Sequence, residues 1–255
     1  TSKLDKVVLA RAVDIEFPVA IDPRLVAARL IDLSANRDGF IADLSPAGRP
    51  GAMLVGSSPE VLVKRQGSTV SAFPLAGSSP RRASAAEDHI AGQDLLHSAK
   101  DLHEHSFVVE HLRHVLSPLC ERLDIPDTPQ LISTNEMWHL GTPISGTLKD
   151  KDLTALELAL AVHPTPAICG TPAEAAQALI ETAETDRGFY AGAVGWCDSS
   201  GDGEYMVAIR CAEVAGDGLS ARAWAGGGIV GDSDAQAELE ETTAKLRTIL
   251  KALSL

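Results

Sequence analysis

Two pairs of carboxylates with the same spacing are the residues of this chain best suited to chemistry. Asp101 and Glu104 lie three apart in a helical stretch, and Glu238 and Glu241 repeat that spacing near the C-terminus. Residues three apart on a helix project from the same face. Two such helices side by side predict an all-oxygen site suited to Mg²⁺, with water completing the coordination. Solvated helix faces and ordinary helix caps have the same spacing, so the pairs alone leave both interpretations open.

A glycine-rich stretch offers a second possible site. Residues 226–231 match G-x-G-x-x-G between an expected strand and an expected helix, as in dinucleotide-binding loops. The sequence given ends about one helix later, which leaves no room for the returning strand of such a fold. Close approach of the glycine backbone to a small anionic ligand is the alternative that we retain.

Histidines gather between His97 and His114 without the spacing of a metal site. His103 and His105 are two apart, so on a helix they point to different sides. His111 and His114 can share a face, but the H-E-x-x-H pattern is absent, as is the G-x-S-x-G motif of hydrolases. We expect these histidines to lie on a solvated or hydrogen-bonded helix face.

Composition places the chain among globular proteins that bind no nucleic acid. Its 255 residues are 45% hydrophobic and 22% charged, which suits one large domain or two small ones with a sizeable core. The formal net charge of −13 disfavours a surface for nucleic acid. An anionic substrate would need local cations or a bound metal to overcome this negative field.

The sequence also bears on location. No apolar run approaches the roughly 20 residues that span a bilayer, and residues 1–6 lack the apolar stretch of a signal peptide. The four cysteines form no C-x-x-C pair, and we expect reduced thiols in the core. These features predict a cytoplasmic protein without a membrane partner.

Strand and helix patterns come in groups. Strands are expected over 6–15, 53–55, 61–63 and 70–73 and repeatedly over 190–230, a loop over 36–51, and helices over 23–33, 85–123, 153–162, 172–185 and 234–253. Pro172 suits a first helical turn, and Ser233 with Gln236 forms a capping-box pattern. Because strands are adjacent rather than alternating with helices, the pattern predicts an α+β fold with antiparallel sheets.

Short blocks along nearly the whole chain resemble the chorismate-utilising enzyme family, which includes isochorismate, salicylate, anthranilate and aminodeoxychorismate synthases. They follow in the family's order at 5–11 (DKVVLAR), 56–60 (GSSPE), 74–78 (PLAGS), 101–105 (DLHEH), 138–140 (WHL), 163–167 (HPTPA), 195–198 (GWCD), 209–212 (IRCA), 225–230 (AGGGIV) and 238–242 (ELEET). The resemblance implies a single chorismate-binding catalytic domain over 1–255, with antiparallel sheets flanked by helices.

The resemblance also implies a mechanism. In isochorismate formation, water attacks ring carbon 2 of chorismate while the hydroxyl at carbon 4 departs, so a base and an acid must act on opposite faces of the ring. Lys6 matches the base and Glu60 the acid. Desolvation favours the neutral form of both side chains, as these roles require. Taken singly, Lys6 resembles an exposed strand lysine and Glu60 a turn carboxylate.

The same resemblance assigns a metal site and a substrate pocket. Glu104 and Glu241 match direct Mg²⁺ ligands, with Asp101 and Glu238 acting behind them or through water. Arg210 and Lys245 match cations that hold substrate carboxylates, although surface salt bridges would explain both residues equally. The remaining positions supply close backbone approach or line the pocket: Gly77, Ser78, Gly226, His139, Ala167 and Tyr190.

Ala76 distinguishes branches within the family. The aminodeoxychorismate branch tends to place a nucleophilic lysine there, and alanine cannot attack the ring. The blocks at 74–78 and 163–167 resemble the isochorismate branch, which serves siderophore or menaquinone synthesis. We therefore expect an isochorismate synthase. A salicylate synthase, which goes on to eliminate pyruvate, and a non-catalytic chorismate-binding remnant remain the alternatives.

One departure from the family concerns the N-terminus. Family members carry a further segment of sheet and helix before the block that contains Lys6, whereas here Lys6 lies near the start of the sequence. We expect that this segment is missing, is supplied by a separate chain, or is dispensable in a compact member.

Overall fold

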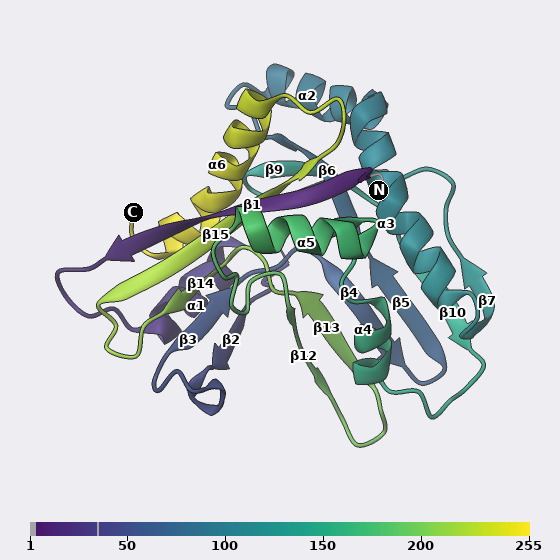
Figure 1. Ribbon diagram of the computed structural model, residues 1–255, viewed down its shortest axis with the longest axis horizontal. Helices are drawn as coiled ribbons and strands as arrows, with labels where there is room; N and C mark the ends of the chain where they lie inside the picture. The colour runs from purple at the N-terminus through teal and green to yellow at the C-terminus, as the bar shows by residue number, and fades with distance from the viewer. Residues whose placement is uncertain (1–3, 35) are drawn as a thin grey trace.

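Antiparallel strands in three sheets form the framework of the computed structural model, which describes residues 4–34 and 36–255 (Figure 1). The first sheet runs in the order β11 (Gly170–Thr171), β1 (Lys6–Glu16), β15 (Ser220–Ile229), β14 (Cys211–Val214), β3 (Met53–Gly56), β2 (Phe40–Asp43). The second runs β12 (Ala193–Cys197), β13 (Gly203–Val207), β4 (Val61–Gln66), β5 (Thr69–Phe73), β10 (Ile144–Leu148), β7 (Cys120–Asp124). The third contains β6 (Leu75–Pro80), β9 (Met137–Gly141) and β8 (Gln130–Ser133). The predicted α+β class with antiparallel sheets is confirmed.

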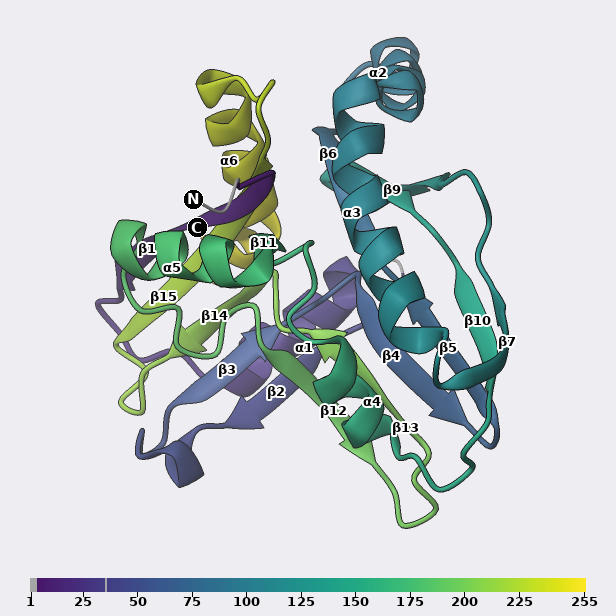
Figure 2. The same cartoon turned by 45° about the vertical axis from the view of Figure 1, so that its right-hand side comes forward.

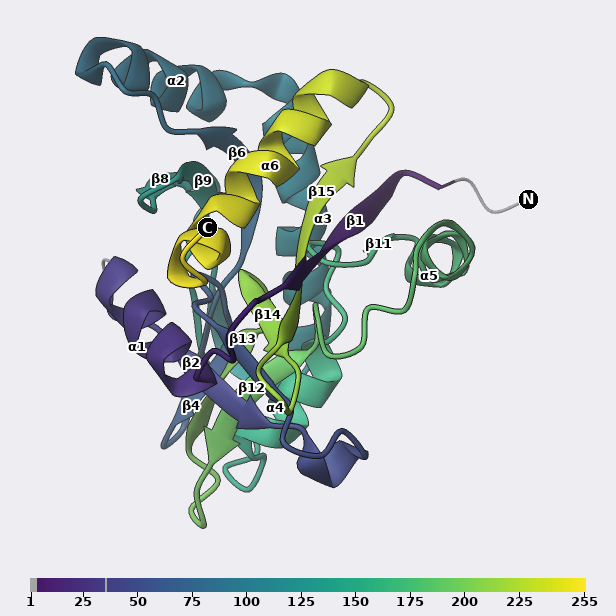
Figure 3. The ribbon, with the colours of Figure 1, turned by 90° about the vertical axis from the view of Figure 1, so that its left-hand side faces the viewer.

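Helices cover these sheets on several sides (Figures 2 and 3). They are α1 (Pro23–Leu33), α2 (Ala85–His97), α3 (Ala99–Leu116), α4 (Ala155–Val162), α5 (Ala173–Ala183) and α6 (Ala235–Ala252), with a short 3-10 helix η1 (Ser45–Ala47). Figure 3 shows α1 and α6 on one side of the β1–β15 pair and α5 on the other. Helix α2 contacts β6 and β9 of the third sheet.

The longest strand pairing joins the first and the last strand of the described residues. Strand β1 pairs with β15 from Val7 opposite Ile229 to Glu16 opposite Ser220. The glycine-rich end of β15 thereby lies beside the start of β1, and Lys6 itself pairs with Thr171 of β11. Because Lys6 is tied into the sheet, its backbone is held in a fixed place.

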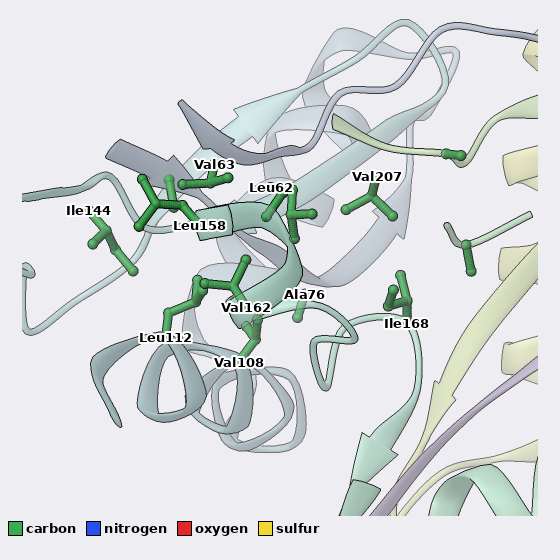
Figure 4. Close-up of a cluster of buried hydrophobic side chains, with 14 of the residues drawn as sticks. Leu62, Val63, Ala76, Val108, Leu112, Ile144, Leu158, Val162, Ile168 and Val207 are labelled. Carbon is green, nitrogen blue, oxygen red and sulfur yellow. The ribbon is translucent and has the colours of Figure 1, made fainter. Parts of the chain in front are cut away.

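The largest hydrophobic cluster fills the space between the second sheet, α3 and α4 (Figure 4). Val108 and Leu112 lie four apart on α3, and Leu158 and Val162 lie four apart on α4, so each helix presents one apolar face. Strand residues such as Leu62 complete the cluster. A separate cluster packs α1 and α6 against the first sheet.

The structure corrects the helix expected over 85–123. This stretch forms two helices that meet at Ser98, whose hydroxyl accepts a hydrogen bond from the N–H of Asp101 and so caps α3. Residues 120–124 then form the strand β7, which pairs with β10 at the edge of the second sheet and buries Cys120. The strands β8, β9 and β10 were not predicted.

Three local predictions were also wrong. The loop expected over 36–51 contains β2 and η1. Asp234 rather than Ser233 caps α6, since its carboxylate accepts from the N–H of Ala237. Pro172 is the cap of α5 rather than a residue of its first turn.

The thiol prediction is confirmed for three cysteines: all four are free, and Cys120, Cys169 and Cys211 are buried, whereas Cys197 is only partly buried. None of the helices in the described part of the chain is both long and apolar enough to cross a membrane.

The core predicts a stability difference between two leucines. Leu112 is fully buried on α3, whereas Leu160 of α4 is 69% exposed. We expect Leu112→Ala to lower the free energy of unfolding by about 2–5 kcal/mol in a urea titration, because it leaves a cavity. The control Leu160→Ala should change it by only about 0.5 kcal/mol. Equal effects of the two variants would contradict the packing described here.

Candidate active site

Most of the predicted site residues line one cavity, although they come from distant parts of the chain. They lie on β6, α3, β9, β15 and α6 and in the loops before β4, β11, β12 and β14. The predicted residues that border the cavity are Glu60, Gly77, Ser78, Glu104, His139, Ala167, Tyr190, Arg210, Gly226, Glu241 and Lys245. The fold thus brings together side chains whose proximity could be inferred from sequence only through family resemblance.

Lys6 reaches this group through Glu104. Its ammonium nitrogen Nζ lies 3.1 Å from Oε1 of Glu104, and Lys6 is only 1% exposed. Among the described residues, Nζ has no partner in hydrogen-bonding geometry. Gly228 makes room for this pair, because a Cβ there would lie 2.1 Å from Oε1 of Glu104. Nζ of Lys6 is therefore buried beside the Glu104 carboxylate and makes no hydrogen bond within the described residues.

Glu241 belongs to a second buried ion pair. Nζ of Lys245, one turn further along α6, lies 2.5 Å from its Oε1, and the hydroxyl of Ser78 donates to the same oxygen at 2.8 Å. Nζ of Lys245 also donates to the carbonyl of Gly226 at 2.9 Å. Burial raises the pKa of Glu241, but the charge and hydrogen bond of Lys245 and the bond from Ser78 outweigh it and lower the pKa overall. Glu241 is thus ionised.

Glu60 has the opposite character. It is 3% exposed, and this burial raises the pKa of its carboxyl to about 7, despite the Leu75 N–H and the positive charges of Lys6, Lys245 and Arg210. Desolvation outweighs these attractions because none of the three cations forms an ion pair with Glu60 within the described residues. A carboxyl with this pKa can hold a proton at neutral pH and release it during a reaction.

Arg210 and His139 form a polar wall of the cavity. Nη2 of Arg210 lies 3.3 Å from Nε2 of His139, and both side chains are buried. Burial, with the charges of Arg210 and Lys245, lowers the pKa of His139 well below its usual value, so the ring is neutral. Since a guanidinium only donates, Nε2 accepts and the ring proton lies on Nδ1.

Two residues without the freedom of glycine adopt left-handed backbone at this wall. Arg210 has φ of 52° and Ala191 has φ of 63°, and both border the cavity. Such conformations cost non-glycine residues roughly 1–2 kcal/mol each and concentrate at functional sites. The surrounding packing therefore holds the backbone of Arg210 in a conformation that it would rarely adopt by itself.

Sequence reasoning missed several apolar residues of the cavity: Val8, Ile168, Ala191, Ile209 and Trp224. Trp224 stacks on Tyr190 with ring centroids 5.9 Å apart and an interplanar angle of 13°. One signal was available, since Trp224 and Gly226 are two apart on a strand and residues two apart face the same side.

Asp101 and Glu238 lie behind the cavity rather than on its surface. Asp101 accepts a hydrogen bond from Ser98 at 2.5 Å. Oε1 of Glu238 accepts from Lys100 at 2.7 Å and from Ser233 at 2.8 Å, and its Oε2 is buried without a partner in the described residues. No three His, Cys, Asp or Glu side chains of residues 4–34 and 36–255 converge as a ready-made metal site.

The chain is similar to known proteins along nearly its full length. A family model described as chorismate binding enzyme matches residues 1–254. Identity is 52% over 252 residues to a Mycobacterium tuberculosis protein named "Putative isochorismate synthase MenF", covering 98% of this chain and 68% of that protein. Identity is 46% over 253 residues to isochorismate synthase DhbC of Bacillus subtilis, and the match covers 98% of this chain and 63% of that protein.

A solved structure of a similar protein has the same fold as this chain. The crystal structure named "putative 2,3-dihydroxybenzoate-specific isochorismate synthase, DhbC" from Bacillus anthracis superimposes with a TM-score of 0.95 at 43% identity, covering 99% of this chain and 67% of that one. The chain thus spans about two thirds of the length of these relatives.

The raised pKa of Glu60 predicts a pH-dependent effect on stability. Below about pH 4.5 the carboxyl is protonated in both folded and unfolded chains. As the pH rises towards 7, only the unfolded chain releases the proton, so the wild type loses stability. We expect Glu60→Gln, measured by urea unfolding, to gain up to about 3 kcal/mol over the wild type between pH 4.5 and 8. A pH-independent difference would show that Glu60 titrates normally.

Proposed function

This chain belongs to the family of chorismate binding enzymes, and we propose on that premise that it isomerises chorismate to isochorismate. The observation that carries the proposal is the pairing of two groups around one cavity: a carboxyl with a pKa of about 7 on Glu60 and a buried lysine, Lys6, beside Glu104. Naming of the relatives as isochorismate synthases supports the same reaction.

The proposed reaction exchanges one hydroxyl for another. In its neutral form, Lys6 takes a proton from a water molecule whose oxygen bonds to ring carbon 2. The ring double bonds shift, the bond from carbon 4 to its hydroxyl breaks, and Glu60 gives its proton to the departing oxygen, which leaves as water. The pKa of Glu60 suits this donation, because an acid works best when its pKa lies near the operating pH.

Holding a dianionic substrate requires positive charge inside an acidic protein. Arg210 is buried, and both Arg210 and Lys245 border the cavity. The planar guanidinium can bind a carboxylate through two parallel hydrogen bonds. We propose that Arg210 and Lys245 bind the substrate carboxylates, with Tyr190, His139 and Ala167 shaping the pocket around the ring.

The donor set fits Mg²⁺ as a cofactor. Glu104 and Glu241 border one cavity, Gly228 leaves space for the carboxylate of Glu104, and Oε2 of Glu238 lies buried without a partner in the described part. Mg²⁺ characteristically binds one or two protein carboxylates and keeps water and substrate oxygens as its other ligands. Glu104 and Glu241 would hold it, with Asp101 and Glu238 behind them. When bound, it would neutralise a substrate carboxylate.

The product of the reaction tests the proposal. Chorismate incubated with the chain and Mg²⁺ should yield isochorismate by chromatography, and Glu60→Gln should lower kcat by about 10²–10⁴-fold because its amide cannot donate the proton as an acid does. The control Glu110→Gln, on an exposed part of α3, should keep full activity. Intact chorismate with the wild type would refute the isomerase, and salicylate with pyruvate would identify a salicylate synthase instead.

The metal assignment makes a separate prediction. Chorismate binding measured by calorimetry should depend on Mg²⁺, and Glu104→Gln should raise the Mg²⁺ concentration needed for half-maximal binding by about tenfold or more. Glu240→Gln is the matched control, because Glu240 neighbours Glu241 but is exposed. Binding that is insensitive to chelation of Mg²⁺ in the wild type would contradict the assignment.

A further inference from the structure

The strand β6, which carries Gly77 and Ser78 to the cavity, contains a bulge. Leu75 pairs with Gly141 of β9 and Ser78 pairs with His139, so β6 advances three residues while β9 advances two. Ala76 and Gly77 occupy the extra step, and Gly77 has φ of 78°. A bulge leaves backbone groups without ladder partners and redirects the strand, and bulges are frequent beside active sites.

His105 of α3 binds the backbone at this bulge. Its Nδ1 lies 3.0 Å from the carbonyl oxygen of Ala76, and its Nε2 lies 2.7 Å from Oγ1 of Thr142. His105 is 2% exposed and Thr142 is 1% exposed. Since the carbonyl can only accept, Nδ1 donates to Ala76, and the hydroxyl of Thr142 donates to Nε2 of the neutral ring. The mechanism proposed above uses neither residue.

This contact fixes the orientation of the next peptide. The peptide bond between Ala76 and Gly77 is trans, so the N–H of Gly77 points opposite to the carbonyl that His105 holds. Holding that carbonyl towards α3 therefore turns the N–H of Gly77 away from α3. Gly77 borders the cavity, and a side chain there would be strained, because φ is 78° and a Cβ would lie only 3.1 Å from Cβ of Asp101.

We propose that His105, anchored by Thr142, is a positioning residue that acts through the Ala76 carbonyl to set which backbone atoms of Gly77 and Ser78 meet the substrate. The inference rests on the proposed function, since the substrate is chorismate. Ala76 also belongs to the buried cluster that contains Val108 of α3 (Figure 4). Packing holds the strand against the helix, and His105 sets the direction of its peptide.

The experiment compares two histidines on the same helix. His111 also binds a backbone carbonyl, that of Val162 at 2.9 Å, but this carbonyl lies outside the cavity. With Mg²⁺ present, calorimetry should show that His105→Leu raises the Kd for chorismate by about tenfold or more, with KM rising more than kcat falls. His111→Leu should leave Kd within about twofold of the wild type, even where both variants lower Tm.

Conservative variants separate positioning from packing. The amide of His105→Asn can donate from near the place of Nδ1, so this variant should restore Kd to within about threefold of the wild type. Thr142→Val, which removes the hydroxyl donor but keeps the volume, should raise Kd by about threefold, and Thr142→Ser should not. The two Thr142 variants also test the proposal should His105→Leu fail to fold.

Two results would overturn the inference: unchanged Kd in folded His105→Leu and Thr142→Val, or an equal rise in Kd for His111→Leu. Failure of the proposed function would give a different result: the wild type would bind chorismate with Mg²⁺ but convert none of it. The comparison of Kd values would still decide the role of His105 in that case. A wild-type chain that binds no chorismate would reject both.

Discussion

The burial of charge around one cavity is the constraint on which the rest of this structure depends. A buried charge without a partner is costly, and four charged groups of this region meet that cost in two pairs: Lys6 with Glu104, and Lys245 with Glu241. Arg210 is buried without an ion pair among the described residues, and the proposed substrate carboxylate would neutralise it. Glu60 has no ion-pair partner among the described residues, and it meets the same cost by holding its proton to about pH 7. The desolvation of charge thus accounts both for the buried ion pairs and for the proton-holding carboxyl of Glu60 that the proposed chemistry requires.

The fold is the means of assembling these charges. The ladder between β1 and β15 places residues 8–10 opposite the glycines of residues 226–228, and Gly228 leaves the space in which Lys6 meets Glu104 of α3. Helix α6 presents Glu241 to the same cavity. Strand β6 and its bulge form another side, held to α3 by His105. The glycine motif that resembles a dinucleotide loop has a different role here, since its three consecutive glycines lie in β15 and provide room for carboxylates.

Much of this arrangement was predictable from the sequence, for reasons that differ between residues. The helix over 23–33 was predicted with its correct bounds. Its start is readable in the sequence, because Asp22 caps the helix and Pro23 begins it. Periodicity failed over 120–148, where the short strands lack a clear alternation, and where β10 and β9 pair with β5 and β6 far away in sequence. The i, i+3 spacing predicted that Glu104 and Glu241 each lie on the face of a helix. Only the resemblance to the family predicted that the two helices face one cavity. The role of His105 followed from neither, because it depends on a carbonyl in a bulge.

The ionisation of Glu60 tests the central claim most directly. Carbon-13 NMR of the glutamate side-chain carboxyls, with the Glu60 signal assigned from its loss in Glu60→Gln, follows this group alone as the pH changes. The account predicts a midpoint near pH 7, where burial sets the pKa. A midpoint near 4.5, the value of an ordinary glutamate, would contradict it, because the cavity would then hold a charged carboxylate with no proton to give.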